Sequence, residues 1–591
     1  MSIAYSTINS KLKSFFFNII SFGLASGCFI WPERMSYAAW QNLLKSRLWF
    51  IGANGHVRSQ KSKCKRRLSR RYRKFLQAQI RWNNGVTHKN ELEALEQHKN
   101  EDSKLELITM LKKFWERKHV SQHIEETIHD KRNQDLITYS KQSIMMSALA
   151  IFLLRMESGN KFDDKTHDED EKYSKANVAK FIDAPEERVP VIKTIEKFLK
   201  NLEEKSVNDL MITFFKDLQQ SKFFTQHPQI MPGDFFLLAA DCVHTHTYSH
   251  SHNIDMHGNN NCECCLQRIY NKGTEHEKIK WLHNTLVFSF VFMGGLKIPI
   301  YRHPIHAKQI VNFESASEDA YKQECELVAL KATLPIIRQS FPRMKMVLLL
   351  DGLYANRPAI RLAEENKCGY IIVRKEACLS LLANECDEHS KQLNHKKNCV
   401  RKRQKVDDKG WNIEQKYEWF NSMYLGDNVK TNVLRFWEMR TKEGKEPESY
   451  KCEWLFSWRL SEKTCELAAR QARIRWEIED LFNSLKNRGF NLKHDYSRDP
   501  RSCFNWQGLA LFAFGIFELF RFSEAVKERG DWPQSTLANK LLGQLLYHPT
   551  NELFCERCLS KQIQFRYHFV VELLLSSEIH QGGIEKVLET G

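Results

Sequence analysis

Two short apolar runs, each followed directly by an aspartate, limit the folds open to this chain more than any other feature. Residues 235–240 read FFLLAA and precede Asp241, and residues 344–350 read MKMVLLL and precede Asp351. Runs with almost no polar face are typical of strands that are buried on both sides, in a sheet covered by helices. The surrounding chain has strand patterns at 286–293, 297–301 and 370–373, and helical patterns at 323–340 and 356–367. Strands that alternate with helices predict an α/β fold.

The two aspartates point to a metal site. In open α/β sheets, ligands bind at the carboxyl ends of the strands, which is where Asp241 and Asp351 are predicted to lie. An acid beside a buried strand is costly unless something compensates its charge, and a divalent cation commonly does so. A single such aspartate would more simply cap a turn or helix, but two at neighbouring strand ends favour a metal site.

A third carboxylate comes from residues 473–489, RIRWEIEDLFNSLKNRG, which we predict to form one amphipathic helix. Glu479 lies on a polar stripe with Arg475 and Lys486, beside an apolar stripe that would pack on the sheet. Three carboxylates can hold two Mg²⁺ (or Mn²⁺) ions about 3.5–4 Å apart, which clamp the attacking and leaving oxygens of a phosphodiester. Arg475 and Lys486 would then contact DNA phosphates. The simpler interpretation of this stripe is an ordinary row of surface ion pairs.

Two other acids on the same helix compete with Glu479. Glu477 lies on the opposite side of the helix and has Ser484, not a lysine, two turns later. Asp480 has no cation at either offset. Glu479 is therefore the preferred third ligand.

The charge of the chain favours a polyanionic partner. The formal net charge is +17 over 591 residues, and residues 56–82 hold 11 Lys or Arg with no Asp or Glu. A basic segment of this kind can track DNA phosphates without reading sequence, or can be a solvated tail. The arginines assigned to DNA contact in this segment are Arg66, Arg67, Arg70 and Arg71.

A Cys/His cluster after Asp241 suggests a second metal. Cys262 and Cys265, with His257 and His283, have the ligand types of a structural zinc site that would fix the loop. A polar loop with unligated thiols is the alternative. Cys555 and Cys558 form a second, weaker CxxC pair with His548 nearby.

At these positions the chain resembles insertion-sequence DDE transposases of the group marked by a Tyr-Arg-Glu-Lys signature. Arg475, Glu479 and Lys486 match the spacing Y-x2-R-x3-E-x6-K, whereas the Tyr position holds Ala472. The runs DGLYANRPAI (351–360), KQECEL (322–327) and CECCL (262–266) also resemble one subgroup. Cys242 departs from that subgroup, in which Gly commonly follows the first Asp.

The resemblance implies a ribonuclease-H-like mixed sheet flanked by helices, interrupted between the second Asp and the Glu by an antiparallel β insertion. It implies a transposase that cleaves phosphodiesters at transposon ends and transfers the freed 3′-hydroxyl to target DNA or to the opposite strand. Asp241, Asp351 and Glu479 would be the catalytic acids. Double-stranded DNA, a homodimer on paired ends and a cytoplasmic, nucleoid-associated location are also implied.

These patterns predict a division of the chain into segments. The segments are an apolar leader (1–55), a basic segment (56–104), a helical region that is a candidate for DNA binding (105–230), a catalytic domain (231–375 and 470–540), a β-rich insertion (376–469) and a C-terminal tail (541–591). Within the insertion we predict a polar break at 376–410, followed by strands at 418–425, 433–440 and 452–460.

Three alternatives remain open beside the transposase. A metal-dependent nuclease on the same fold would share the three acids but lack strand transfer. A decayed or domesticated copy would bind DNA without catalysis. A membrane anchor rests only on the apolar residues 14–31, and the Asn and Ser residues among them disfavour it.

Overall fold

The computed structural model describes residues 105–167, 173–248, 264–271, 273–305, 318–375, 378–407, 409–497, 499–567 and 569. The apolar leader, the basic segment and the arginines at 66, 67, 70 and 71 lie outside these residues. All the described residues belong to one compact unit, His98–Gly591.

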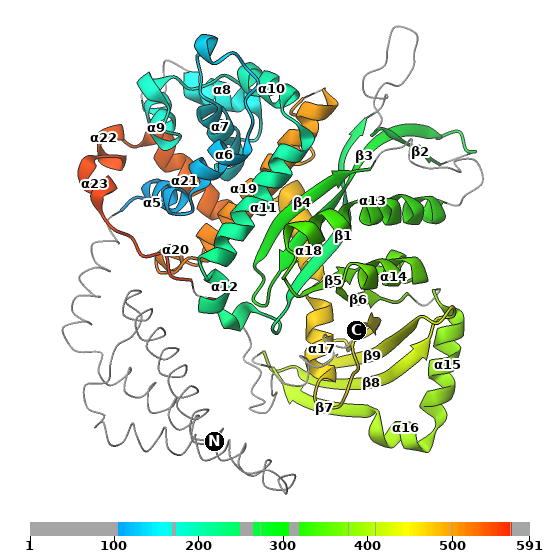
Figure 1. Ribbon diagram of the computed structural model, residues 1–591. Coiled ribbons are helices and arrows are strands. Elements are labelled where there is room, and N and C mark those ends of the chain that lie inside the picture. Colours follow the sequence, from blue (N-terminus) through cyan, green and yellow to red (C-terminus); the bar gives the residue numbers. More distant parts are fainter. Residues whose placement is uncertain are drawn as a thin grey trace, which may run out of the picture. The chain divides into compact units, whose positions relative to one another are not determined.

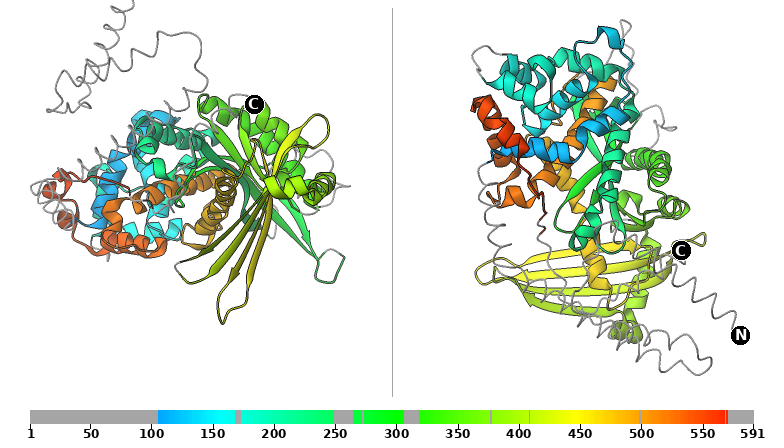
Figure 2. Two further views of the ribbon diagram at one scale, coloured as in Figure 1. Left: turned by 90° about the horizontal axis from the view of Figure 1, so that it is seen from below. Right: turned by 60° about the vertical axis from the view of Figure 1, so that its left-hand side comes forward.

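The described part is a mixed α/β structure, as predicted, with helices on both sides of a mixed parallel and antiparallel sheet (Figures 1 and 2). The strands are β1 (Phe236–Tyr248), β2 (Leu266–Tyr270), β3 (Lys278–Val291), β4 (Lys297–Pro304), β5 (Met346–Leu350), β6 (Gly369–Val373), β7 (Val400–Val406), β8 (Asn412–Tyr424), β9 (Lys430–Thr441) and β10 (Glu448–Phe456). They follow the spatial order β2-β3-β1-β5-β6-β10-β9-β8-β7, and β4 also pairs with β3. β1, β5 and β6 run parallel to one another, whereas the pairs of β1 with β3, β3 with β4 and β6 with β10 are antiparallel.

Helices fill the described residues before β1. They are α5 (Leu107–Arg117), α6 (Val120–Thr127), α7 (Lys141–Leu153), α8 (Gly159–His167), α9 (Ser174–Phe181), α10 (Ile192–Asn201), α11 (Glu204–Gln220) and α12 (Phe223–Gln226). The C-terminal helices are α19 (Pro500–Arg521), α20 (Glu524–Lys527), α21 (Gln534–Tyr547), α22 (Thr550–Leu553) and α23 (Glu556–Ser560). α21 packs against α5 and α9, so helices from both ends of the described chain share one core (Figure 1).

α19 is the central helix of that core. Pro500 occupies its first turn, and the Asp499 carboxylate accepts a hydrogen bond from the backbone N–H of Ser502. Its apolar side chains face in all directions, and it contacts α7, α10, α11 and β4. Among the described helices it alone has the length and hydropathy to cross a membrane, but its apolar window is completely buried within the protein. A buried core helix passes the same test.

The segment between β6 and α17 (Cys465–Arg473) differs from the prediction in one respect. The polar break predicted at 376–410 is wrong, because α15 (Ser380–Lys391), α16 (Leu393–Asn398) and β7 all lie there. The strand β7 reads VRKRQKV and alternates between half-buried and exposed residues, without an apolar face that the sequence pattern could reveal. The three strands predicted after the break are present as β8, β9 and β10.

The β insertion continues the central sheet, because β10 pairs directly with β6. An ion-pair network reinforces this junction. The Glu453 carboxylate on β10 accepts hydrogen bonds from Arg374 Nε at 2.5 Å and from Arg435 Nε at 3.0 Å, and all three side chains are at least nine-tenths buried. Arg435 also pairs with Asp387 on α15. The network links the strands β9 and β10 to the end of β6 and to the helix α15.

Two helices cover the sheet beside the insertion where one was predicted. α17 is followed by α18 (Trp476–Asn487), and a turn at residues 474–475 separates them. The single helix predicted over 473–489 is therefore wrong at its start, although its end near Gly489 is confirmed by the left-handed φ of +96° at that glycine. The buried side chains of α18 include Ile478, Leu481, Phe482 and Leu485, which form the predicted apolar stripe.

Candidate functional site

Asp241 and Asp351 lie at equivalent positions on neighbouring parallel strands. β1 and β5 pair through Ala239 and Leu349, and each aspartate lies two residues beyond its member of that pair. Because side chains alternate along a strand, this spacing places both carboxylates on the same face of the sheet, and the charge of Asp351 acts on Asp241. Backbone amides orient them: the N–H of Cys242 donates to Asp241 Oδ1 at 2.8 Å, and the N–H of Leu353 donates to Asp351 Oδ1 at 2.9 Å.

The expectation that Asp241 ends its strand is wrong. β1 continues to Tyr248 as the antiparallel partner of β3, and only its parallel pairing with β5 stops at Ala239. Asp241 therefore marks the point where β1 parts from β5. Asp351 does follow the last residue of β5, as predicted.

Arg475 links the first aspartate to Glu479. Its Nη1 atom lies 3.6 Å from Asp241 Oδ2, and its Nη2 atom donates to Glu479 Oε1 at 2.5 Å. The residue is 8% exposed and lies in the turn that begins α18. The turn between α17 and α18 thus brings Glu479 to the face that carries the two aspartates.

The electrostatics of this cluster disfavour ionisation of Asp241. Burial, followed by the negative charge of Asp351, raises the pKa of Asp241 to about 6, although Arg475 acts in the opposite direction. Glu479 adds a smaller contribution that also raises this pKa. The raised pKa of Asp241 therefore reflects its burial first and the negative charge of Asp351 second, and Arg475 offsets these effects only in part.

The two competing acids are engaged elsewhere. Lys297, at the start of β4, has its Nζ atom 2.6 Å from Glu477 Oε2 and 2.6 Å from Asp480 Oδ2. Arg488 Nη2 also lies 2.9 Å from Asp480 Oδ1. The sequence offsets could not reveal this arrangement, because Lys297 is 180 residues before Glu477. Only Glu479 shares a cation with Asp241 among the three acids.

Two lysines lie near the carboxylates. Lys486 is half-buried, and its pKa is lowered first by burial and then by Lys493, while the charge of Asp241 raises it. Lys375 was missed by sequence reasoning, and its Nζ atom is 3.8 Å from Asp351 Oδ2. It follows β6 by two residues, so the rule that selected the strand-end aspartates could also have found it.

Two aromatic positions also bear on the site. Ala472, which stands at the Tyr position of the signature, is buried at 2% exposure and presents no aromatic surface. Trp476 is 55% exposed, and the Arg475 guanidinium lies 5.2 Å from the centre of its ring. Sequence reasoning missed Trp476, although a tryptophan on the polar side of an amphipathic helix is a recognisable signal.

The side chains of this cluster are suitable ligands for a divalent cation, but their arrangement in this structure is not that of a metal site. No group of three or more His, Cys, Asp and Glu side chains within the described ranges is arranged to hold a metal ion. At Asp241 and Glu479, the Arg475 guanidinium holds the carboxylate oxygens by direct contact. Carboxylate oxygens are nevertheless the ligands that Mg²⁺ prefers, and the raised pKa of Asp241 shows that added positive charge would stabilise its ionised form.

The predicted zinc site is described only in part. Cys265 Sγ lies 3.1 Å from His283 Nε2, so these two ligand candidates are in contact. His257 and Cys262 lie outside the described residues, and zinc binding stays a prediction. Cys555 Sγ and Cys558 Sγ are 3.0 Å apart at the start of the short helix α23.

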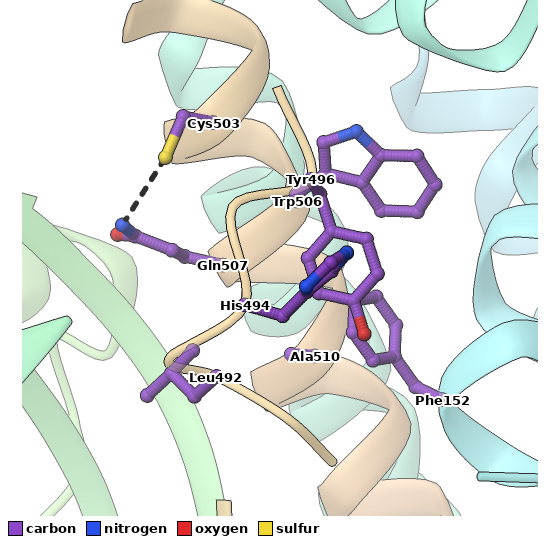
Figure 3. Close-up of a pocket in the computed structure, with 8 residues that line it drawn as sticks. All are labelled: Phe152, Leu492, His494, Tyr496, Cys503, Trp506, Gln507 and Ala510. Atoms are coloured by element: carbon purple, nitrogen blue, oxygen red, sulfur yellow. Dashed lines mark hydrogen bonds between the residues drawn. The ribbon is translucent and has the colours of Figure 1, made fainter. Parts of the chain in front are cut away.

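A small, partly open pocket lies apart from this cluster. Its volume is about 10 Å³, the size of one water molecule. Figure 3 shows the Tyr496 ring lying among Phe152, His494 and Trp506 beside it, and Tyr496 and Trp506 stack with their centroids 5.1 Å apart. The pocket lies between α7, α19 and the segment 492–496 that precedes α19, and it is too small for a substrate.

Comparison with known proteins found no match: the sequence matches no protein-family model and no curated protein.

Proposed function

We propose that this protein is a DNA transposase that cleaves phosphodiesters at transposon ends with divalent metal ions and transfers the new 3′ end into target DNA. One observation carries the proposal. Asp241 and Asp351 each lie two residues beyond the last pair of the parallel strands β1 and β5, and Arg475 joins Asp241 to Glu479 on α18. These are the three acids that the family resemblance implies as catalytic.

The strand order supports the ribonuclease-H-like assignment. β1, β3 and β4 form an antiparallel meander, and β5 and β6 then lie parallel to β1 on its other side. This gives the order β4-β3-β1-β5-β6, with the first acid on the central strand and the second after the next strand. The insertion strands β7–β10 lie between the second Asp and the Glu in sequence, as the family resemblance implies.

Asp241, Asp351 and Glu479 would hold the metal ions, which would supply an activated water and stabilise the charge that develops on the phosphate. Arg475 would give up a carboxylate contact when the acids bind metal. Its Nε atom is buried and has no hydrogen-bond partner among the described residues, so its guanidinium has donor capacity in reserve. We infer that it then binds a DNA phosphate, and that Lys486 near Asp241 and Lys375 near Asp351 contribute further phosphate contacts.

Two other functions share parts of this site. A metal-dependent nuclease would use the same acids and stop after cleavage. An inactive DNA-binding descendant would retain the cations, and the replacement of the signature tyrosine by the buried Ala472 is the observation that favours it. A homodimer on paired DNA ends in the cytoplasm follows from the family resemblance and belongs to the same proposal.

A cleavage assay tests the function directly. The substrates are duplexes that carry the DNA flanking the coding region on each side, incubated with the full chain in Mg²⁺, Mn²⁺ or EDTA. We expect metal-dependent nicks with 3′-hydroxyl ends, and joining of those ends to a second duplex. Cleavage without joining would favour the nuclease, and binding without cleavage in either metal would favour the inactive descendant.

Lys486→Ala should weaken binding to the end duplex about tenfold and reduce the slope of log affinity against log salt by about 1. The reason is that a half-buried ammonium on the Glu479 face would lose a single phosphate contact. Filter binding over a salt series measures both quantities. Lys493→Ala is the matched control, because Lys493 lies near Lys486 but donates to Asn487 Oδ1 at 3.2 Å. An unchanged slope for Lys486→Ala would remove this lysine from the site.

A further inference from the structure

Another cavity, lined by lysine and arginine side chains, lies on the β insertion. It has a volume of about 360 Å³ and is open to solvent between α17, the strands β7, β8 and β9, and the turn after β3. Lys405, Arg440, Arg470 and Arg473 line it, together with Gln415 and Tyr417. We call this surface the insertion groove.

The groove follows from strand alternation on the insertion. Gln415 pairs with Glu438, and Tyr417 pairs with Phe436, so these side chains share one face of β8 and β9. Arg440 lies two residues beyond Glu438 on that face. On β7, Arg403 contacts Glu466 of α17, which places its side chain, and that of Lys405 two residues later, on the same face.

Cations outnumber acids on this face. Six cationic side chains reach it, and the carboxylates beside them are Glu438 and Glu466. The six are Arg401, Arg403, Lys405, Arg440, Arg470 and Arg473. Cationic excess on a concave surface concentrates the field and attracts polyanions.

The two acids orient the arginines without neutralising the groove. Glu438 is 4% exposed and accepts hydrogen bonds from Gln415 Nε2 at 2.6 Å, Arg440 Nε at 2.9 Å and Arg473 Nη1 at 3.2 Å. The side chains of Arg440 and Arg473 are each 37% exposed, so further N–H donors remain open to solvent. The backbone of Lys405 pairs with Ile413 in β8, whereas its side-chain ammonium makes no hydrogen bond or ion pair within the described residues.

From this geometry we propose that the insertion groove binds the phosphate backbone of DNA at a place separate from the catalytic acids. Alternate residues on β7 repeat about every 6.7 Å, close to the separation of successive phosphates along a nucleic-acid strand. Arginine and lysine in a polar groove are the side chains that contact phosphates. The groove is lined by few exposed apolar atoms, which disfavours an apolar peptide.

The groove and the catalytic acids lie on either side of the turn between α17 and α18. Arg473 lines the groove, whereas Arg475, two residues later, contacts Asp241 and Glu479. The inference depends on the proposed function only for the identity of the polyanion as DNA. Binding in EDTA tests it without any requirement for cleavage.

Lys405→Glu and Lys402→Glu provide a matched pair for the test. Both change the charge of β7 by the same amount, but Lys402 is exposed and points to the opposite face of the strand. With the full chain, a duplex of roughly 30 base pairs and EDTA, we expect Lys405→Glu to weaken binding five- to tenfold and to lower the salt slope by about 1 or more. Lys402→Glu should change affinity by less than about twofold.

Lysine acetylation followed by mass spectrometry gives a second readout on the wild-type protein. The duplex should protect Lys405 several-fold and leave Lys402 reactive, while inorganic phosphate at the same phosphate concentration should protect neither. Equal affinities for the two variants, or protection of Lys405 by inorganic phosphate but not by the duplex, would overturn the proposal. Loss of cleavage in Asp351→Asn with Lys405 still protected would support a binding surface independent of catalysis.

Discussion

Asp351→Asn should lower the rate of DNA cleavage by about a thousandfold or more, while the affinity for the end duplex changes by less than about twofold. Metal ions contribute several kcal/mol to the stabilisation of the charged transition state, and each 1.4 kcal/mol corresponds to a factor of ten in rate. The substitution removes an anionic ligand but no cation. Its carboxamide oxygen can still accept the hydrogen bond from the Leu353 N–H, so the local turn should persist.

Asp234→Asn is the control for this result. Asp234 precedes β1 and pairs with Lys345, which precedes β5, at the opposite edge of the same two strands. Its cleavage rate should match the wild type, and single-turnover assays on both variants measure the contrast. Retained cleavage in Asp351→Asn would remove that residue from the proposed site.

The same assay decides between the acids of α18. Glu479→Gln should lose cleavage to a similar extent, whereas Glu477→Gln should retain it, because Lys297 keeps its contact with Asp480. If Glu477→Gln lost cleavage instead, the third ligand would be Glu477 and the pairing with Lys297 would have to break in the active complex.

Asp241→Asn should stabilise the metal-free protein at neutral pH. In the folded protein the pKa of Asp241 is raised from 3.8 to about 6, a difference that corresponds to roughly 3 kcal/mol at most. Because the folded-state pKa is the higher one, the ionised carboxylate opposes folding: the penalty is absent below pH 3.8 and complete above pH 6. We expect a gain of about 1–3 kcal/mol at pH 7.5 and almost none at pH 4.

A divalent metal ion should make the wild type more stable than Asp241→Asn, which reverses the order expected in EDTA. Mg²⁺ at about a hundred times its dissociation constant would stabilise the wild type by about 2.7 kcal/mol and would affect Asp241→Asn far less. Thermal melts in EDTA and in Mg²⁺, at both pH values, measure these differences. Asp234→Asn should follow the wild type in every condition. A wild type that is more stable than Asp241→Asn in EDTA at pH 7.5 would contradict the electrostatic account.

The parts of the site that lie on buried strands were predictable from the sequence, because a fully apolar run has few alternatives. β5 and Asp351 were placed within two residues for this reason. The extension of β1 past Asp241 was not, since Cys242–Tyr248 are small or polar residues whose strand conformation depends on pairing with β3. The turn between α17 and α18 was hidden because Ile474 and Arg475 are ordinary helix formers.

Contacts between distant segments could not be read from local patterns. Lys297 binds the two acids that competed with Glu479, and the network around Glu453 joins the insertion to β6, yet neither has a signal in sequence spacing. Lys375 is different, since it follows a predicted strand at the same sheet edge as Asp351 and was overlooked.

The continuous sheet between β6 and β10 has a geometric consequence for DNA handling. Hydrogen-bonded strands, reinforced by Arg374, Glu453 and Arg435, leave no hinge between the insertion and the strand beside β5. DNA bound in the insertion groove would therefore be held at a fixed distance from Asp241 and Asp351. We therefore expect a constant number of nucleotides between the phosphate that the groove binds and the phosphodiester that is cleaved.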